Sequence, residues 1–229
     1  MPVITFANSK GGCGKTTSAL LLGCELAVLK PVTIIDADPR RPLTRWAALP
    51  NQPENLTVVT NQSEKTILDE IEAAAARDPF VIVDLEGTAS RLMSYAVSQS
   101  DLVIIPVKEQ QQDAEAAIEV IKEIRRDMQA VRRTIPYALL FTMTKVVAKS
   151  RTARLINRQF RMSEAIDTFA TEINERDAFA AIFATGGSIR GLEPTKVNNI
   201  EAAIANVRDF TAEVIERLKM QTGQIQEVA

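Results

Sequence analysis

Between two apolar segments the chain reads Lys10-Gly11-Gly12-Cys13-Gly14-Lys15-Thr16-Thr17. The run before it, residues 3–7, has the β-branched composition of a buried strand, and the apolar residues of 16–29 recur at helical spacing. A glycine-rich loop between a strand and a helix lets backbone amides approach an anion, because glycine has no Cβ and the helix N-terminus is electropositive. This stretch therefore predicts a phosphate-binding loop.

The end of the loop fits the nucleotide-binding pattern G-x-x-x-x-G-K-[ST], except that Ser9 replaces the first glycine. Lys15 is predicted to reach the β- and γ-phosphates, and the Thr16 hydroxyl to ligate Mg²⁺. The alternative is a glycine-rich turn that only caps a helix, but strand, loop, Lys-Thr-Thr and helix coincide here. The predicted nucleotide contacts of the loop are Gly11, Gly12, Cys13, Gly14, Lys15, Thr16 and Thr17.

The rest of the chain alternates between apolar runs and helical patterns. The predicted strands are residues 3–7, 32–35, 56–59, 80–83, 102–107 and 137–141. The predicted helices are residues 16–29, 64–76, 113–128, 151–165 and 199–218. Apolar strands separated by helices favour an α/β fold with a mostly parallel twisted sheet and helices on both faces. We expect one domain over residues 1–220 and a polar, frayed tail over 221–229.

Composition excludes several classes of protein. The 229 residues contain no histidine, which excludes a His base, a His-containing triad and a His-ligated metal. The two cysteines, Cys13 and Cys24, form no CxxC pair, which excludes a disulfide framework and a Cys-rich zinc site. No apolar run is long enough to span a membrane, and no charged leader opens the chain. We expect a soluble cytoplasmic protein.

The lysine before the paired glycines adds a further signal. With Lys10 in that place, KGGCGKTT resembles the deviant Walker A motif of the ParA/MinD family of ATPases. The resemblance implies a homodimer closed by ATP, in which Lys10 crosses the interface to the nucleotide of the partner subunit. There it adds a cation where negative charge is neutralised during phosphoryl transfer. The alternative is a solvated surface lysine.

Three carboxylates extend the resemblance. Asp36-Ala37-Asp38-Pro39 is similar to the family's D-x-D-P element, which implies that Asp36 lies near Mg²⁺ and that Asp38 orients the attacking water. Asp84 ends the apolar run 80–83 as a Walker B aspartate does, and is expected to hold Mg²⁺ through water. The predicted metal site therefore comprises Thr16, Asp36 and Asp84.

Other positions depart from the family or match it less specifically. Residues 85–88 read Leu-Glu-Gly-Thr where many relatives have a proline-containing turn, and Gly87 is expected to offer its amide to the γ-phosphate. Asp113 is predicted to be the N-cap of the following helix. The resemblance places Thr142 and Thr144 where adenine-contacting groups fall.

Charge is distributed unevenly along the chain. The net charge is −2, yet eight Lys or Arg and no Asp or Glu lie between residues 128 and 163. On a helix, four of these arginines share one face, and Leu155, Ile156 and Phe160 line much of the other. The predicted DNA contacts are Lys145, Lys149, Arg151, Arg154, Arg158 and Arg161.

This basic face predicts non-specific binding to double-stranded DNA through its phosphates, weakening steeply as salt rises. The alternative is a solvated helix face paired with acids from elsewhere in the fold. Single-stranded stacking is not favoured, because Phe160 is the one aromatic residue on that helix. The closing segment mixes acids with bases, so no membrane binding is expected.

These features predict a Mg-ATP-dependent switch that hydrolyses ATP slowly. The ATP dimer would bind DNA and associate with the nucleoid, and a centromere-binding or adaptor protein would stimulate hydrolysis and release, for segregation or cargo positioning. The chain is also similar to a ParA-like accessory ATPase of T-DNA transfer, which would recruit a relaxase–DNA complex. A third reading is a metabolic P-loop enzyme, a small-molecule kinase or amidoligase, which would turn over a small acceptor and ignore DNA.

Overall fold

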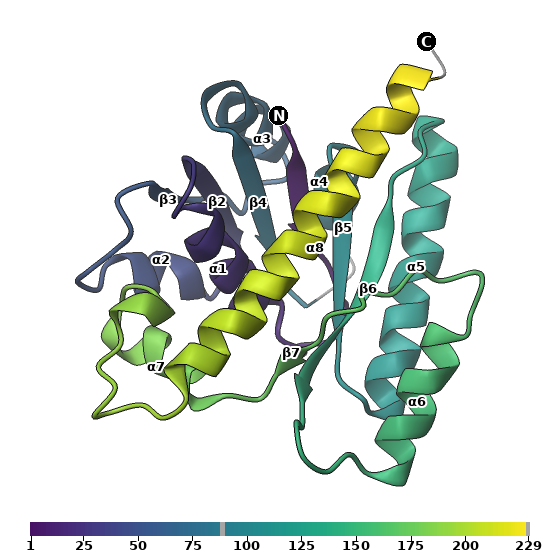
Figure 1. The fold of residues 1–229 in the computed structure, drawn as a ribbon. Coiled ribbons are helices and arrows are strands. Elements are labelled where there is room, and N and C mark those ends of the chain that lie inside the picture. The colour runs from purple at the N-terminus through teal and green to yellow at the C-terminus, as the bar shows by residue number, and fades with distance from the viewer. Residues whose placement is uncertain (88–89, 228–229) are drawn as a thin grey trace.

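The computed structural model describes residues 1–87 and 90–227, which form a central sheet between two layers of helices (Figure 1). Within these residues, seven strands lie in the order β3-β2-β4-β1-β5-β6-β7, and every neighbouring pair is parallel. The strands are β1 (Val3–Phe6), β2 (Val32–Ala37), β3 (Leu56–Thr60), β4 (Phe80–Leu85), β5 (Leu102–Val107), β6 (Tyr137–Thr144) and β7 (Ile173–Asn174). The predicted fold class is confirmed.

Helices cover both faces of the sheet. One layer contains α1 (Lys15–Leu26), α2 (Pro42–Ala47), α7 (Asp177–Thr185) and α8 (Ile200–Glu227), and α8 crosses the sheet diagonally in Figure 1. The other layer contains α3 (Ile67–Arg77), α4 (Arg91–Ser98), α5 (Gln111–Val131) and α6 (Arg151–Arg161). A single 3-10 turn, η1 (Ile189–Gly191), precedes α8 in the described chain.

The two layers explain why the strands are apolar almost without interruption. Along β1, Ile4 packs into the core beneath α1 and α8, whereas Val3 packs into the core beneath α3 to α5. The same alternation puts Ile34 and Ile35 of β2 into opposite cores. Successive side chains of a strand point to opposite faces, so a sheet covered on both faces needs apolar residues at every position.

Short elements were the ones that the sequence patterns did not predict. Helices α2, α4 and α7 and strand β7 were not among the predicted elements, because each is too short to show a clear period. At the other end of the chain, α8 continues to Glu227, so residues 221–227 of the expected frayed tail are helical. No proline follows residue 218, so no residue there forces the helix to end.

Parallel pairing brings the ends of several strands to one edge of the sheet. The loop after β1 lies there, because β1 pairs with β4 on one side and with β5 on the other. Asp36 and Asp84 are register partners on β2 and β4, so their backbones are adjacent at this same edge. Ligands of open α/β sheets bind at the carboxyl ends of the strands.

Candidate nucleotide-binding site

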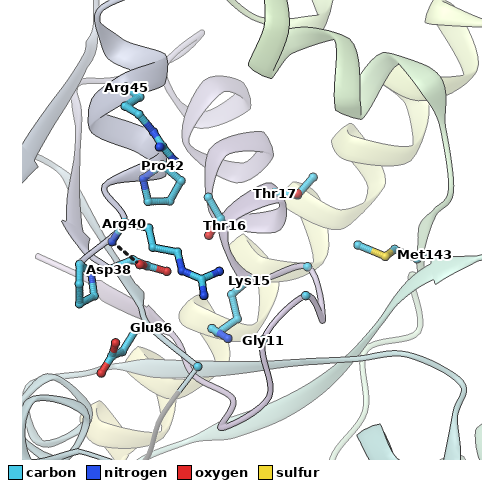
Figure 2. Close-up of a pocket in the computed structure, with 14 residues that line it drawn as sticks. Gly11, Lys15, Thr16, Thr17, Asp38, Arg40, Pro42, Arg45, Glu86 and Met143 are labelled. Atoms are coloured by element: carbon cyan, nitrogen blue, oxygen red, sulfur yellow. Dashed lines mark hydrogen bonds between the residues drawn. The ribbon is translucent and has the colours of Figure 1, made fainter.

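The glycine-rich loop after β1 curves around the start of α1. Gly12 and Gly14 have φ values of 72° and 93°, in the left-handed region that favours glycine, and Gly14 is the N-cap of α1. The loop forms one wall of a cleft of about 610 Å³ (Figure 2). The cleft is lined by Gly11, Gly12, Gly14, Lys15, Thr16, Thr17, Asp38, Pro39, Arg40, Pro42, Arg45, Glu86, Gly87 and Met143. A loop of this shape at a helix N-terminus suits phosphate.

Lys15 is held against the loop that precedes it. Its side chain is buried, and Nζ donates a hydrogen bond of 2.9 Å to the Lys10 carbonyl. Cys13 is also buried, with its Sγ 3.3 Å from the same carbonyl, and burial raises the pKa of its thiol. Cys13 therefore stabilises the loop from within, and the ammonium of Lys15 lies beside the cleft that the loop encloses.

The two acidic strand ends lie beneath the loop. Asp36 and Asp84 are fully buried, and Asp36 Oδ2 accepts hydrogen bonds from the backbone N (2.7 Å) and the hydroxyl (2.8 Å) of Thr44 on α2. The second oxygen of Asp36 and both oxygens of Asp84 have no hydrogen-bond partner among the described residues. The pKa of Asp84 is raised to about 7, mainly by burial and also by the neighbouring charge of Asp36, and the Thr16 hydroxyl and Lys15 offset part of this rise.

Buried carboxylate oxygens without partners indicate a cation site. Within residues 1–87 and 90–227, no three His, Cys, Asp or Glu side chains converge as a protein-only metal cage. Mg²⁺ is instead commonly bound by one or two carboxylates, with waters and substrate phosphates completing its shell. Asp36, Asp84 and the Thr16 hydroxyl fit such an ion.

Asp84→Asn is expected to stabilise the protein without nucleotide by a few kcal/mol at pH 8, and to abolish stabilisation by Mg-ATP. Because the folded pKa is above the unfolded value of 3.8, ionised Asp84 destabilises the fold, fully above pH 7, much less at pH 4.5 and not at all below pH 3.8. Denaturant unfolding at pH 4.5 and 8 checks this, with exposed Asp209→Asn as the control. Equal stability of the variant and the parent at pH 8 would contradict it.

Asp38 lies on the cleft wall opposite the loop. It is half-buried, and its Oδ1 accepts a 2.7 Å hydrogen bond from the backbone N of Arg40. Figure 2 shows Asp38 and Arg40 facing the cleft from one side and Lys15 from the other. Gly87 approaches from β4, where a Cβ would come within 2.9 Å of the Gly11 nitrogen. The segment after Asp84 therefore reaches the loop, and the role expected for the Gly87 amide at the γ-phosphate stays a prediction. Thr88 lies outside the described residues.

Lys10 is paired within its own chain. Its Nζ lies 2.5 Å from Oδ2 of Asp113, a carboxylate that is 1% exposed. The predicted N-cap role of Asp113 is wrong, because Gln110 occupies the N-cap position and Asp113 lies in the first turn of α5. The strand β5 and its loop bring this first turn to the carboxyl edge of the sheet, next to the loop that carries Lys10.

A second cavity of about 580 Å³ adjoins the cleft. Thr142 lines it, but its hydroxyl donates 2.6 Å to the Cys13 carbonyl, and Gly14 packs against its side chain. Thr144 is buried and accepts a hydrogen bond from Asn174, outside the lining of this cavity. The cavity shares Gly14, Thr17 and Met143 with the cleft, so the two are neighbours.

Sequence reasoning missed several cavity residues. Met143 lies at a bulge of β6 with φ 52°, where no local signal marks it. Arg176 follows β7 and lines the second cavity with Asn174. Arg40 and Arg45 line the cleft, and the position of Arg40 directly after Asp38-Pro39 was the available signal.

The predicted DNA-contacting residues divide into two groups. Lys149 lies 2.7 Å from Glu109 and 2.5 Å from Glu172, and Arg161 lies 3.0 Å from Glu172. These two cations are neutralised within the fold. Leu155, expected on the buried side of the helix, is 56% exposed. Of the six predicted contacts, the other four are exposed and make no ion pair with a described residue: Lys145, Arg151, Arg154 and Arg158.

Residues 1–220 match the family model described as VirC1 protein. The chain belongs to the VirC1 family. This VirC1-family chain is 37% identical over 219 residues to Protein ParA of Rhizobium radiobacter, covering 95% of the chain and 98% of that protein. It is 31% identical over 195 residues to Protein virC1 of the same organism, covering 81% and 82%. The expected ParA/MinD kinship is confirmed.

Solved structures share the fold of the VirC1-family chain. Apo McdA of Cyanthece superposes with a TM-score of 0.76 at 15% identity, covering 91% of the chain and 98% of McdA. A putative plasmid partition protein from Borrelia burgdorferi B31, bound to AMPPNP, gives 0.71 at 17% identity, covering 94% and 99%. No helix in the described part of the chain has the length and apolar character needed to span a bilayer.

Proposed function

We propose that the chain is a Mg-ATP-dependent dimerising switch that binds DNA non-specifically and releases it after ATP hydrolysis, in segregation or cargo positioning. The observation that carries the proposal is the cleft lined by the glycine-rich loop, Lys15 and Asp38. The buried carboxylates Asp36 and Asp84 are register partners at the same edge of the sheet. The ParA relative and the plasmid partition protein support the same task.

The residues around the cleft have the groups that ATP hydrolysis requires. The loop amides and Lys15 would bind the phosphates, and Asp38 would orient a water molecule toward the γ-phosphorus. The water oxygen bonds to phosphorus as the bond to the β–γ bridging oxygen breaks, so ADP leaves and the water protons pass to phosphate and solvent. Mg²⁺, held by Thr16, Asp36 and Asp84, supplies charge neutralisation when bound.

Dimerisation would depend on Lys10. The Lys10 side chain is a third exposed, and Asp113 is its ion-pair partner among the described residues. Lys10 can therefore turn toward another anion if it gives up this ion pair. A nucleotide bound in a second copy offers the anionic group that would compete for Lys10. ATP, with its additional phosphate, would thus favour the dimer more than ADP does.

The unpaired cations would form the DNA surface. Arg151, Arg154 and Arg158 lie on α6 within one face, and Lys145 lies in the loop before it. A dimer presents this surface twice, and two linked weak sites bind far more tightly than one because the second contact becomes intramolecular. ATP would therefore control DNA affinity through the dimer.

The experiment that tests the proposal measures DNA binding with Mg-ATP, Mg-ADP or no nucleotide across a salt series. Tight binding with ATP alone, falling steeply with salt, is the expected result. A sequence-scrambled duplex should bind equally well. Binding that is indifferent to the nucleotide would contradict the switch, and absence of binding at low salt would contradict the DNA role.

Charge reversal of Arg154 and Arg158 to Glu is expected to remove DNA binding while leaving the ATP-dependent dimer intact, because both side chains are exposed and unpaired. DNA affinity should fall at least a hundredfold. Each arginine that neutralises a phosphate releases a counterion, and the loss of this contact weakens binding by roughly tenfold or more per arginine. Gel-shift and light scattering measure the two properties. Arg208→Glu with Lys219→Glu on α8, in the opposite layer, is the matched control, and its DNA binding should persist.

A second candidate keeps the ATPase and changes the task to recruitment of a relaxase–DNA complex in T-DNA transfer. It is favoured by the match of residues 1–220 to the VirC1 family and by the virC1 relative of Rhizobium radiobacter. Retention of the purified chain on a relaxase–DNA complex, but not on a centromere-binding protein, would favour this task. ATP turnover that required a small acceptor and was unaffected by DNA would instead indicate a metabolic P-loop enzyme, such as a small-molecule kinase or amidoligase.

A further inference from the structure

Arg40 is a cation in the cleft without an acidic partner. Arg40 is exposed and lines the cleft, and its guanidinium makes no ion pair with a residue that the structure describes. Its backbone N donates to Asp38 Oδ1 at 2.7 Å, which fixes the start of the side chain beside the residue proposed to orient water. Figure 2 shows the side chain directed from this loop toward the glycine-rich loop and Lys15.

The neighbouring arginines do not share this position. Arg45 also lines the cleft, but in Figure 2 it lies at the far end, beside Pro42. Arg41 is adjacent in sequence and exposed, yet it does not line the cleft and has a left-handed φ of 51° at the N-cap of α2. Helix α2 is anchored by Thr44 to buried Asp36, so the loop that carries Arg40 is tied to the sheet.

Resting on the proposed ATPase function, we infer that Arg40 is a catalytic residue that contacts the γ-phosphoryl group of the nucleotide bound to its own chain. In phosphoryl transfer, negative charge spreads over the oxygens of the transferred group, and an arginine placed against them in the same chain or from a partner speeds the reaction by roughly 10³- to 10⁵-fold. Arg40 would give this chain an arginine in cis, so a partner protein need not supply one.

The primary test compares Arg40→Ala with Arg41→Asn, which removes the same charge one residue away and tolerates the left-handed backbone. Arg40→Ala is expected to lower single-turnover ATP hydrolysis by about a hundredfold or more, with ATP affinity little changed. Its affinity for Mg-ADP with aluminium fluoride, which mimics the planar γ-phosphoryl group, should fall much more than its affinity for Mg-ADP. Arg41→Asn should match the parent in all three measurements.

Equal loss of affinity for ADP and for ADP with aluminium fluoride would overturn the assignment, because a merely structural arginine affects both alike. Guanidinium ion added to Arg40→Ala should restore part of the rate of hydrolysis. Arg40→Lys should hydrolyse ATP more slowly than the parent, because the lysine ammonium lacks the planar fork of the guanidinium. If the parent chain binds ATP but hydrolyses none, the proposed ATPase function fails, while the aluminium fluoride comparison still tests the contact of Arg40.

Mixed dimers test whether Arg40 acts in cis. In a dimer of Lys10→Ala and Arg40→Ala protomers, the Lys10→Ala protomer keeps its own Arg40 and receives the partner's Lys10, so one site should turn over. If Arg40 acted across the interface, neither site would. Mixing Lys10→Ala with Asp38→Ala is the control for the trans lysine. An active control mixture beside an inactive Arg40→Ala mixture would overturn the cis assignment.

Discussion

Lys15→Ala abolishes ATP binding and hydrolysis in our expectation, with ATP affinity falling at least a hundredfold. The side chain brings one of the few cations of the cleft to the phosphates, and its Nζ bonds to the Lys10 carbonyl, so the loop also loses an internal hydrogen bond. A charge-assisted contact to phosphate contributes about 1.5–3 kcal/mol, and the loss of loop order adds to this. Titration with a fluorescent ATP analogue measures the affinity.

Lys30→Ala is the matched control, because Lys30 is exposed just beyond the other end of α1 and far from the loop. It should bind and hydrolyse ATP as the parent does. Hydrolysis at the parental rate by Lys15→Ala would refute the site assignment, whereas loss of activity in both variants would point to a general effect on α1.

Lys10→Ala is expected to leave a monomer in the presence of Mg-ATP, which light scattering would detect as the absence of a dimer. The variant also leaves Asp113 buried without its cation, and this costs stability on the order of 1–3 kcal/mol, reduced from that of a fully buried pair because Lys10 is a third exposed. A loss of dimer therefore has two possible causes, the missing trans contact or the weakened fold.

The double variant Lys10→Ala with Asp113→Asn separates these causes. Replacing the carboxylate with an amide removes the unpaired charge, so the free energy of unfolding should return toward that of the parent. The dimer should remain absent, because the trans lysine is still missing. A dimer that reappears together with the stability would show that Lys10 acts through the fold of its own chain.

The single variant Asp113→Asn should strengthen ATP-dependent dimerisation. It frees Lys10 from its one ion pair in the described chain, so less energy is lost when Lys10 turns to a second copy. The dimer should therefore form at lower ATP concentration than in the parent, as light scattering over an ATP titration would measure.

Much of the fold could be predicted because its signals are local. Buried parallel strands are recognisable as apolar runs, and the residues that cradle phosphate are consecutive in the chain. Strand β7 and helix α2 escaped prediction since their few residues show no period, and they are held in place by contacts such as that of Thr44 with Asp36. Met143 at its bulge carried no signal, since its conformation depends on the pairing of β6 with β7.

The distribution of charge along the chain identified a basic segment between residues 128 and 163, and the order of residues in the glycine-rich loop predicted the loop that lines the candidate nucleotide cleft. Which cations are free was settled by folding. Lys149 and Arg161 meet Glu172, and Lys10 meets Asp113, over separations of 23, 11 and 103 residues. Backbone groups that bind phosphate act over a few consecutive residues, but an ion pair depends on distance in space, which only the packed sheet and helices establish.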